Sequence, residues 1–492
     1  MLQRNQRMIP AGGIILLILA LLNGIILTYA YTNNPQLYWW LVISIPLLLA
    51  ATYKTRQKKR ADYSMPNMRL HFFAQREDGN PFKERANLIV HQAAKSAGRV
   101  VAPGMYVNGP TPGSEWEAHS VYPLSTGEED VRVTIGNNQC SQPYNASILI
   151  MEVTGYSLLS NAAVQDLNEG AVPGEFAHNT GEHGISHHYL NGGDLIWQIG
   201  PGYFGCRSEN GNFNTGKFIE NARRPEVKMI ELKLSQSATS GYGSIEPTVT
   251  DSRQLAGGSI NRLPRHTAFS NAEGMLLFIE SLRKLSFGKP VGVRLCIENK
   301  KQVYELCYYI QKTGIIPDFI TVDGFEDATG AVSPEMANEV VMPLYEALTF
   351  VSATLQAYGL KEHIKIIAAG KIISGFDVVK AMALGADACC SAGASRFTQT
   401  LQSAGSNFSI DAANGQSRRY EILDITDRNV WAANFHKNTI KAVTELMAVC
   451  GFKKLSDITV PGFFRLMNFA EIKSASNTYR PHRLRETRKI AF

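Results

Sequence analysis

The sequence predicts an α/β protein: a closed (β/α)8 barrel preceded by an N-terminal transmembrane helical hairpin. Between residues 145 and 400, short apolar runs alternate with amphipathic helical segments, a pattern typical of a parallel sheet covered by helices on both faces. Roughly seven or eight such units over ~250 residues favour a closed barrel over an open sheet. The first 60 residues instead hold two long uncharged apolar stretches.

Composition excludes several classes of protein. The 492-residue chain is 45% hydrophobic and 19% charged, which excludes a disordered, collagen-like or coiled-coil protein. The formal net charge of +6 is too small over this length to indicate a nucleic-acid partner. The 7 cysteines are scattered and form no CxxC pair, which suits a reducing compartment better than a disulfide scaffold.

The N-terminal segment 1–60 carries no charged residue between Arg7 and Lys54. Residues 9–31 are long enough to cross a ~30 Å hydrocarbon core as a helix, and residues 37–53 are near the lower limit. Basic residues flank both ends, so the positive-inside rule places both ends in the cytoplasm. We therefore expect a multi-pass membrane protein with the lipid bilayer as a partner and a cytoplasmic soluble domain. The alternative is a signal peptide followed by a buried helix, but a signal core usually has only ~7–15 apolar residues.

The barrel strands are expected where mostly apolar runs occur: Ser147–Val153, Asp194–Ile199, Val227–Leu234, Pro290–Cys296, Asp318–Asp323, Ile364–Ala369 and Ala386–Ser391. Helical patterns lie between them, at Ala162–Glu169, Asn271–Lys284, Lys300–Thr313, Pro334–Tyr358 and Gly375–Leu384. We expect residues 61–144 to form an N-terminal extension or small subdomain and residues 145–425 to form the barrel. Residues 426–492 would form a C-terminal extension with a helix at Trp431–Cys450 and a basic tail, either solvated or in contact with anionic lipid.

Two turns late in the barrel predict an anion site. A strand ends at Gly370, a helix follows from Gly375, and the next strand ends in small residues. Loops after strands seven and eight of such barrels commonly bind phosphate, because glycines let the backbone approach and helix N-terminal amides hold the anion. Two ordinary tight turns are the alternative. The expected phosphate contacts are Gly370, Lys371, Ser374, Gly375, Ser391 and Ala392.

Polar residues also follow or end other predicted strands, notably Gln198, Lys233 and Asp323. A lysine at the end of an apolar run requires an acceptor if it is buried. A flavin ring provides one, since a cation near its pyrimidine side stabilises the reduced anion; an exposed loop lysine is the alternative. The histidine-rich segment 178–188 matches no usual zinc spacing, and we interpret it as a glycine-rich loop that carries Glu182.

These motifs occur in the same order in a known family. The stretch from about 145 to 400 resembles the FMN-binding domain of glutamate synthase and is most similar to the single-domain, membrane-anchored FMN-binding glutamate synthase family. The segments that carry the resemblance are Leu159–Ala171, His178–Glu182, Gly193–Gly200, Gly202–Cys206, Val227–Gln236, Pro264–Ser270, Asp318–Gly324, Gly370–Asp377 and Asn434–Thr439.

The resemblance implies a barrel that holds FMN and reduces 2-iminoglutarate, formed from 2-oxoglutarate and ammonia, to glutamate. The chain would then be an oxidoreductase that acts on CH–NH2 donors. The implied catalytic residues are Glu182, Gln198, Lys233 and Gln236. Besides the phosphate contacts, the implied cofactor residues are Thr154, Gly155, Gln198, Lys233, Asp323 and Gly324.

The sequence departs from the family at the electron inlet. The family carries a cysteine triad for an iron–sulfur cluster after the eighth strand, whereas residues 391–409 contain no cysteine. The adjacent Cys389 and Cys390 cannot replace three or four spaced thiolates. We therefore expect the iron–sulfur cluster to be absent and no other metal to be bound.

The substrate face is altered as well. Both family lysines in the loop 237–250 are missing, with Thr239 at the first of them, although a dicarboxylate substrate requires cations. The loop 323–330 is bulkier and more acidic than in the family, and Val153–Tyr156 replaces an Ala-Met-Ser-Phe turn.

The chain starts Met-Leu-Gln, without a nucleophilic N-terminal cysteine, and contains no credible NADPH-binding fold. Gly200–Gly205 matches GxGxxG, but no amphipathic helix follows it. Electrons would therefore come from an external donor protein or carrier. We expect a membrane-anchored FMN-dependent oxidoreductase; the alternative is a degenerate barrel, with or without FMN, that acts as a membrane scaffold or sensor.

Overall fold

The computed structural model describes residues 115–125, 131–152, 161–234, 244–245, 260–261, 265–297, 299–324, 342–370, 372–392, 410–411, 417–418, 428–468 and 471–474. The chain divides into two compact units, residues 1–79 and 80–492. All described residues belong to the second unit. The two expected membrane spans, 9–31 and 37–53, lie outside the described residues.

The predicted membrane localisation has to be corrected. Within the described ranges between residues 115 and 474, no helix combines the length and the apolar character that a bilayer crossing requires.

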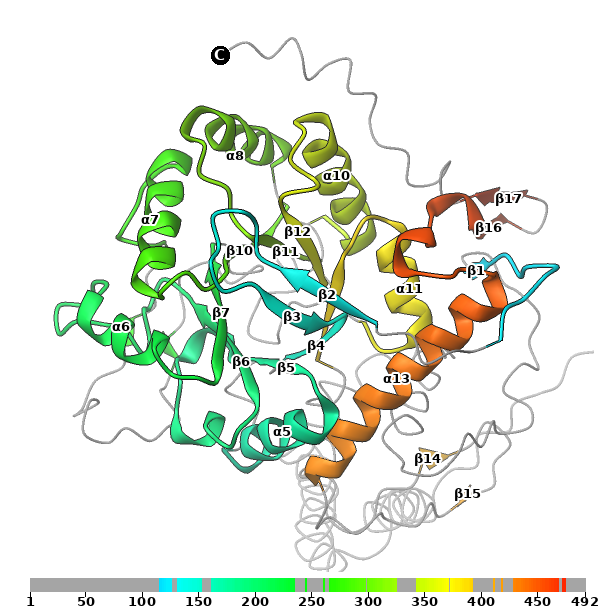
Figure 1. The fold of residues 1–492 in the computed structure, drawn as a ribbon, viewed down its shortest axis with the longest axis horizontal. Coiled ribbons are helices and arrows are strands. Elements are labelled where there is room, and N and C mark those ends of the chain that lie inside the picture. The colour runs from blue at the N-terminus through cyan, green and yellow to red at the C-terminus, as the bar shows by residue number, and fades with distance from the viewer. Residues whose placement is uncertain are drawn as a thin grey trace, which may run out of the picture. The chain divides into compact units, whose positions relative to one another are not determined.

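A closed barrel of parallel strands forms the centre of the second unit (Figure 1) and confirms the predicted barrel. Its strands are β4 (Leu149–Glu152), β5 (Ala177–Asn179), β6 (Asp194–Ile199), β7 (Val227–Lys233), β10 (Val291–Cys296), β11 (Phe319–Asp323), β12 (Lys365–Ala369) and β13 (Ala388–Ser391). Each strand pairs with the next in this order, and β13 closes the barrel on β4. The sequence missed β5, because a three-residue strand with one apolar position produces no apolar run.

Helices surround the barrel (Figure 1): α5 (Asn161–Gly174), α6 (Thr215–Ala222), α7 (Ala272–Leu285), α8 (Lys300–Thr313), α10 (Leu344–Ala357), α11 (Gly375–Ala383) and α13 (Arg428–Cys450). Local sequence signals set several of their ends. The Asn271 side chain caps α7 by accepting a hydrogen bond from the Gly274 amide at 2.8 Å. Gly314 ends α8 at a φ of 72°, a left-handed conformation that favours glycine.

The helix α13 packs against both α5 and α11. Its buried residues Trp431, Phe435, Val443 and Met447 belong to the apolar cluster between the strands and the helices. The structure therefore includes α13 in the helical ring, whereas the sequence analysis assigned this helix to a C-terminal extension.

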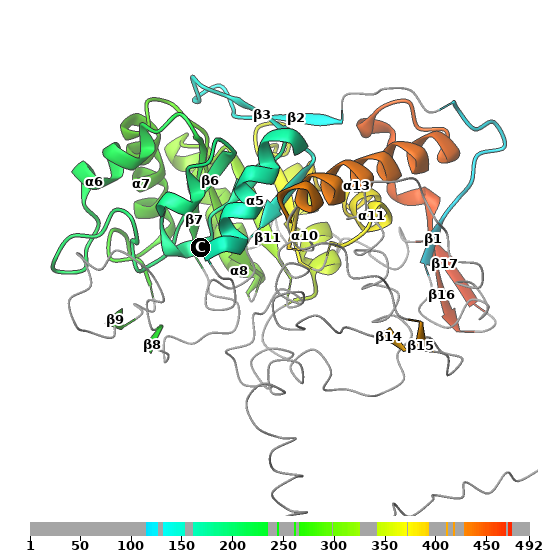
Figure 2. The same cartoon turned by 90° about the horizontal axis from the view of Figure 1, so that it is seen from below.

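A β-hairpin lies across the amino end of the barrel (Figure 2). It consists of β2 (Arg132–Ile135) and β3 (Tyr144–Ser147). Ile135 and Ala146 are fully buried and join the apolar cluster inside the barrel. The hairpin thus closes the amino end with apolar side chains.

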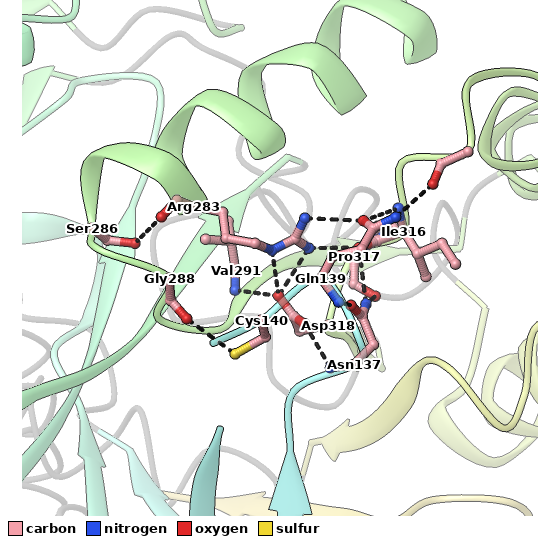
Figure 3. Close-up of polar contacts among 11 residues, drawn as sticks. Asn137, Gln139, Cys140, Arg283, Ser286, Gly288, Val291, Ile316, Pro317 and Asp318 are labelled. Carbon is pink, nitrogen blue, oxygen red and sulfur yellow. Dashed lines mark hydrogen bonds and ion pairs between the residues drawn. The ribbon is translucent and has the colours of Figure 1, made fainter. Parts of the chain in front are cut away.

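The turn of this hairpin is held by one buried ion pair (Figure 3). Asp318 Oδ2 accepts hydrogen bonds from Arg283 Nε at 3.1 Å and Nη2 at 2.9 Å, and from the Val291 amide at 2.8 Å. Asp318 Oδ1 accepts a hydrogen bond from the Asn137 amide in the turn at 2.8 Å. Arg283 Nη1 donates to Gln139 Oε1 at 3.1 Å. The pair therefore joins the hairpin turn to two barrel strands.

A separate antiparallel sheet joins the two expected extensions. It contains β1 (Glu115–Glu117), β16 (Phe463–Asn468) and β17 (Glu471–Ser474). Lys380 of α11 forms an ion pair with Glu115 and lies over the ring of Tyr345 at 3.5 Å. The short strands β8 (Ser244–Ile245) and β9 (Ile260–Asn261) pair with each other, as do β14 (Ile410–Asp411) and β15 (Ser417–Arg418).

Candidate functional site

A layer of polar side chains lies inside the barrel toward the carboxyl ends of the strands. Side chains along a strand alternate between its two faces, so residues two positions apart face the same way. On six strands, an inward apolar residue or glycine is followed two positions later by an inward polar residue. The pairs are Ile150/Glu152, Ala177/Asn179, Ile196/Gln198, Met229/Glu231, Gly292/Arg294 and Phe319/Thr321. On β12 and β13 the equivalent residues, Ala369 and Cys390, are small. Active sites of such barrels lie at this end.

Arg294 is the central cation of the polar layer and is 2% exposed. Its Nη1 contacts Glu152 Oε1 at 2.6 Å, and its Nη2 contacts Asp323 Oδ1 at 2.7 Å. Burial alone would lower the pKa of Arg294, but Asp323, Glu152 and Glu231 together raise that pKa well above its ordinary value. The guanidinium is therefore permanently charged inside the barrel.

Glu231 collects hydrogen bonds from three other strands. Its Oε1 accepts from Asn179 Nδ2 at 2.8 Å and Gln198 Nε2 at 2.7 Å, and its Oε2 accepts from Thr321 Oγ1 at 2.5 Å. Arg294 Nη1 lies 3.9 Å from Glu231 Oε1. One guanidinium thus faces three buried carboxylates, those of Glu152, Glu231 and Asp323.

The predicted catalytic residues Glu182 and Gln198 lie at neighbouring strand ends. Glu182 is in the 3-10 helix η3 (Gly181–His183) directly after β5 and is 6% exposed. Its side chain lies against Gly200, the first residue after β6, where an added Cβ would come within 2.8 Å of Glu182 Oε2. The structure therefore brings the Glu182 and Gln198 segments together.

Lys233 ends β7 and is partly buried. Its carbonyl oxygen lies 2.9 Å from His266 Nε2, which ties the segment 265–270 to this strand end. The other predicted residues Gln236, Thr154, Gly155 and Lys371 lie outside the described residues.

The two turns of the predicted anion site are adjacent. In the β12–β13 register, Ala369 pairs with Cys390, so Gly370 and Ser391 follow at the same level. Ser391 Oγ donates to the Ile372 carbonyl at 2.5 Å, which ties the two turns together. Gly370 has a φ of 139°, a conformation that favours glycine. The Gly324 amide, after β11, donates to the Ala369 carbonyl at 3.0 Å.

Ser374 and Gly375 have contacts that the sequence analysis did not anticipate. Asp377 Oδ2 accepts hydrogen bonds from the amides of Ile373 and Ser374 and from Ser374 Oγ, at 3.1, 3.0 and 2.8 Å. A carboxylate of the chain itself thus caps this helix N-terminus. A Cβ at Gly375 would lie 2.8 Å from Ala442 Cβ, so this glycine allows α11 to approach α13 closely.

The two adjacent cysteines lie on opposite faces of β13. Cys389 belongs to the outer apolar cluster and Cys390 to the inner one. Burial raises the pKa of both thiols, which disfavours the thiolate that binds metal. Among the residues that the structure describes, no group of three or more His, Cys, Asp or Glu side chains is arranged to hold a metal ion.

His178, in the histidine-rich segment, faces the helical layer. Its ring centroid lies 5.3 Å from that of Tyr189, and burial lowers its pKa to about 3. It is a neutral core residue.

Sequence reasoning missed Arg294, Glu231 and Glu152. Each is a charged residue within an expected apolar strand, at Pro290–Cys296, Val227–Leu234 and Ser147–Val153. That signal was available, because a charge inside a buried strand requires a partner.

Fold and site together define a (β/α)8-barrel protein with a charged layer and an adjacent pair of tight turns at the carboxyl end. Residues 120–402 match the family model described as the conserved region in glutamate synthase. The chain therefore belongs to the glutamate synthase family.

Individual relatives agree with this membership. The chain is 40% identical to the glutamate synthase large subunit-like protein YerD of Bacillus subtilis over 268 residues, 53% of this chain and 51% of that protein. It is 26% identical to the archaeal glutamate synthase (NADPH) of Archaeoglobus fulgidus over 272 residues, 53% of this chain and 49% of that protein. The chain spans about half the length of these curated relatives.

Solved structures show a weaker likeness. A flavocytochrome b2 variant with benzoylformate matches with a TM-score of 0.46 and 11% identity, over 84% of this chain and 85% of that chain. A likeness at this TM-score supports no conclusion about ligands.

Proposed function

We propose that this chain is an FMN-dependent oxidoreductase that reduces an imine, such as 2-iminoglutarate, to an amino acid. The observation that carries the proposal is the adjacency of the Gly370 and Ser391 turns at the carboxyl end of the barrel. Membership in the glutamate synthase family supports the same cofactor and reaction.

The residues at the barrel mouth fit a flavin mononucleotide. Gly324, Gly370 and Ala392 are small residues at adjacent strand ends, where the backbone can approach a phosphate. Ala369 and Cys390 leave only small side chains on this side of the polar layer. Ser374, whose amide and hydroxyl are bound by Asp377, positions the turn instead of contacting the phosphate directly.

The chain's own groups have distinct tasks in this proposal. Gly370 and the Ser391–Ala392 turn bind the phosphate through the backbone, and Arg294 holds Glu152 and Asp323 in place beneath the mouth. Gln198 offers a side-chain amide for hydrogen bonding. The carboxyl group of Glu182, near Gly200, would donate or accept a proton. Lys233, at the end of β7, would attract an acidic substrate. Bound FMN would supply hydride transfer to the imine carbon, with electrons drawn from an external donor protein or carrier.

A second candidate function has one observation in its favour. Glu152 and Asp323 both bind Arg294, so the central cation is already neutralised by residues of the chain. In a cofactor-free barrel that acts as a scaffold or sensor, these ion pairs would be complete without a bound ligand.

Flavin binding separates the two candidates. We expect the purified chain to quench the fluorescence of added FMN with a stoichiometry of one. After chemical reduction, a mixture of 2-oxoglutarate and ammonium should re-oxidise the bound flavin. A chain that takes up no FMN contradicts the proposal, and uptake without re-oxidation leaves a flavoprotein with a different substrate.

Two matched glycine variants localise the binding. Gly370→Ala should weaken FMN binding at least about tenfold, because the left-handed turn is strained by a Cβ. Gly359→Ala also adds a Cβ at a positive φ, 70°, with no atom within 4 Å of it, on the amino side of β12. Its FMN affinity should match that of the unaltered chain.

A further inference from the structure

A single buried carboxylate on β7 fixes the orientation of two side-chain amides. Glu231 is 1% exposed, and its Oε1 accepts hydrogen bonds from both Asn179 Nδ2 and Gln198 Nε2. An ionised carboxylate only accepts hydrogen bonds, so each amide must direct its NH2 group toward Glu231. An amide turned the other way would place two acceptors against each other in a buried site.

The orientation of Asn179 passes to the turn that carries Glu182. With its NH2 on Glu231, Asn179 uses Oδ1 to accept a hydrogen bond from the Gly181 amide at 3.0 Å. Gly181 opens the 3-10 helix that contains Glu182. The hydroxyl oxygen of the adjacent Thr180 accepts a hydrogen bond from the backbone N–H of Gln198 at 3.1 Å, which links the two strand ends a second time.

The orientation of Gln198 decides what its side chain can recognise. Nε2 gives one of its two N–H groups to Glu231 at 2.7 Å, which fixes the carbonyl oxygen Oε1 on the opposite side of the amide, where it can accept a hydrogen bond from a ligand. The ligand atom that meets it must be an N–H or O–H donor.

We propose that Glu231 is the positioning residue of the site, which presents Gln198 as a hydrogen-bond acceptor and fixes the turn that carries Glu182. This inference rests on the proposed function. The alternative is an electrostatic role, in which the negative charge of Glu231 acts on Arg294, whose Nη1 lies 3.9 Å from Glu231 Oε1.

Two conservative variants separate geometry from charge. Glu231→Gln removes the charge but keeps an oxygen that can accept from both amides, and the Thr321 hydroxyl can accept from the new NH2 group. Glu231→Asp keeps the charge but withdraws the carboxylate by about one methylene. Misplacement by about 1 Å can cost a catalytic site on the order of 100-fold.

The measurements use the full chain loaded with FMN. We expect Glu231→Gln to lower kcat/KM for imine reduction by no more than about threefold, and Glu231→Asp to lower kcat by more than about tenfold with a smaller change in KM. The visible circular dichroism of the bound flavin should shift in Glu231→Asp and not in Glu231→Gln. Thr321→Val, which removes the third hydrogen bond but neither amide contact, serves as a control for stability.

The outcomes separate this inference from the proposed function. If Glu231→Gln is as impaired as Glu231→Asp, or if Glu231→Asp behaves like the unaltered chain in rate and spectrum, the positioning role is overturned. Those results leave an active flavoprotein and therefore leave the proposed function intact. If the unaltered chain takes up no FMN, the proposed function fails and this inference fails with it.

Discussion

In the described part of the chain, a buried arginine lies at each end of the barrel, but the surroundings of the two arginines differ. At the amino end, Arg283 and Asp318 form a single balanced pair whose polar atoms also bind the backbone and the hairpin turn (Figure 3). At the carboxyl end, Arg294 faces Glu152, Asp323 and Glu231, three carboxylates for one cation.

The difference in charge balance indicates different roles. A balanced, fully hydrogen-bonded pair can join segments without a net buried charge. Surplus buried charge opposes folding unless it is compensated, and local rules of this kind are typically broken at functional sites. We infer that the amino end serves stability, whereas the carboxyl end retains a costly arrangement, as the proposed cofactor site would require.

The largest effect is expected from Asp318→Asn at the amino end. The substitution should lower the free energy of unfolding by about 3–5 kcal/mol, because Arg283 loses the acidic partner that it has in this buried network and the new NH2 group would face other donors. Urea denaturation would measure it. Glu280→Gln, which breaks the exposed pair with Lys284, should cost less than about 0.5 kcal/mol. Equal effects of the two variants would contradict a structural role for the amino-end pair.

An intermediate effect is expected for Glu117. Among the residues that the structure describes, neither of its buried carboxylate oxygens has a hydrogen-bond partner, and burial raises the pKa of Glu117 to about 7 from 4.5. Between these pH values the folded chain binds more protons than the unfolded chain, so stability falls as the pH rises from about 4.5 to 7. Glu117→Gln should remove this dependence and add about 1 kcal/mol above pH 7, allowing for partial solvent screening. Unfolding curves at several pH values would measure it, and an unchanged pH profile would count against the burial effect.

The smallest stability effect is expected from Glu152→Gln at the carboxyl end. The substitution removes one surplus negative charge but keeps an oxygen for Arg294 Nη1, while Asp323 still binds the other side of the guanidinium. The free energy of unfolding should change by less than about 1 kcal/mol. Chemical denaturation beside Asp318→Asn gives the direct comparison; a loss as large as that of Asp318→Asn would mean that both ends are structural.

Sequence reasoning worked where the signal was local and failed where it was not. The strand Asp194–Ile199 and the helix Lys300–Thr313 have the bounds that the sequence predicts. Their signals, an apolar run and asparagine and glycine caps, consist of residues next to one another in the chain. The strand Ala177–Asn179 is too short to leave such a signal. The packing of the helix Arg428–Cys450 leaves no local signal either, since its partners α5 and α11 lie far away in the chain.

The candidate site shows the same division. Gly370 and Ser391 could be predicted as neighbours, because consecutive barrel strands place their carboxyl ends side by side. The contacts of Asp377 with the Ser374 amide and hydroxyl could not be predicted, because a capping box and a phosphate site share the same short motif.

By itself, the sequence determined the alternation of strands and helices, the tight turns and the family motifs, since these depend on residues close together in the chain. Only the tertiary structure decided which charges meet. Glu152, Glu231, Arg294 and Asp323 come from four different strands, and their shared burial inside the barrel exists only once the cylinder has closed.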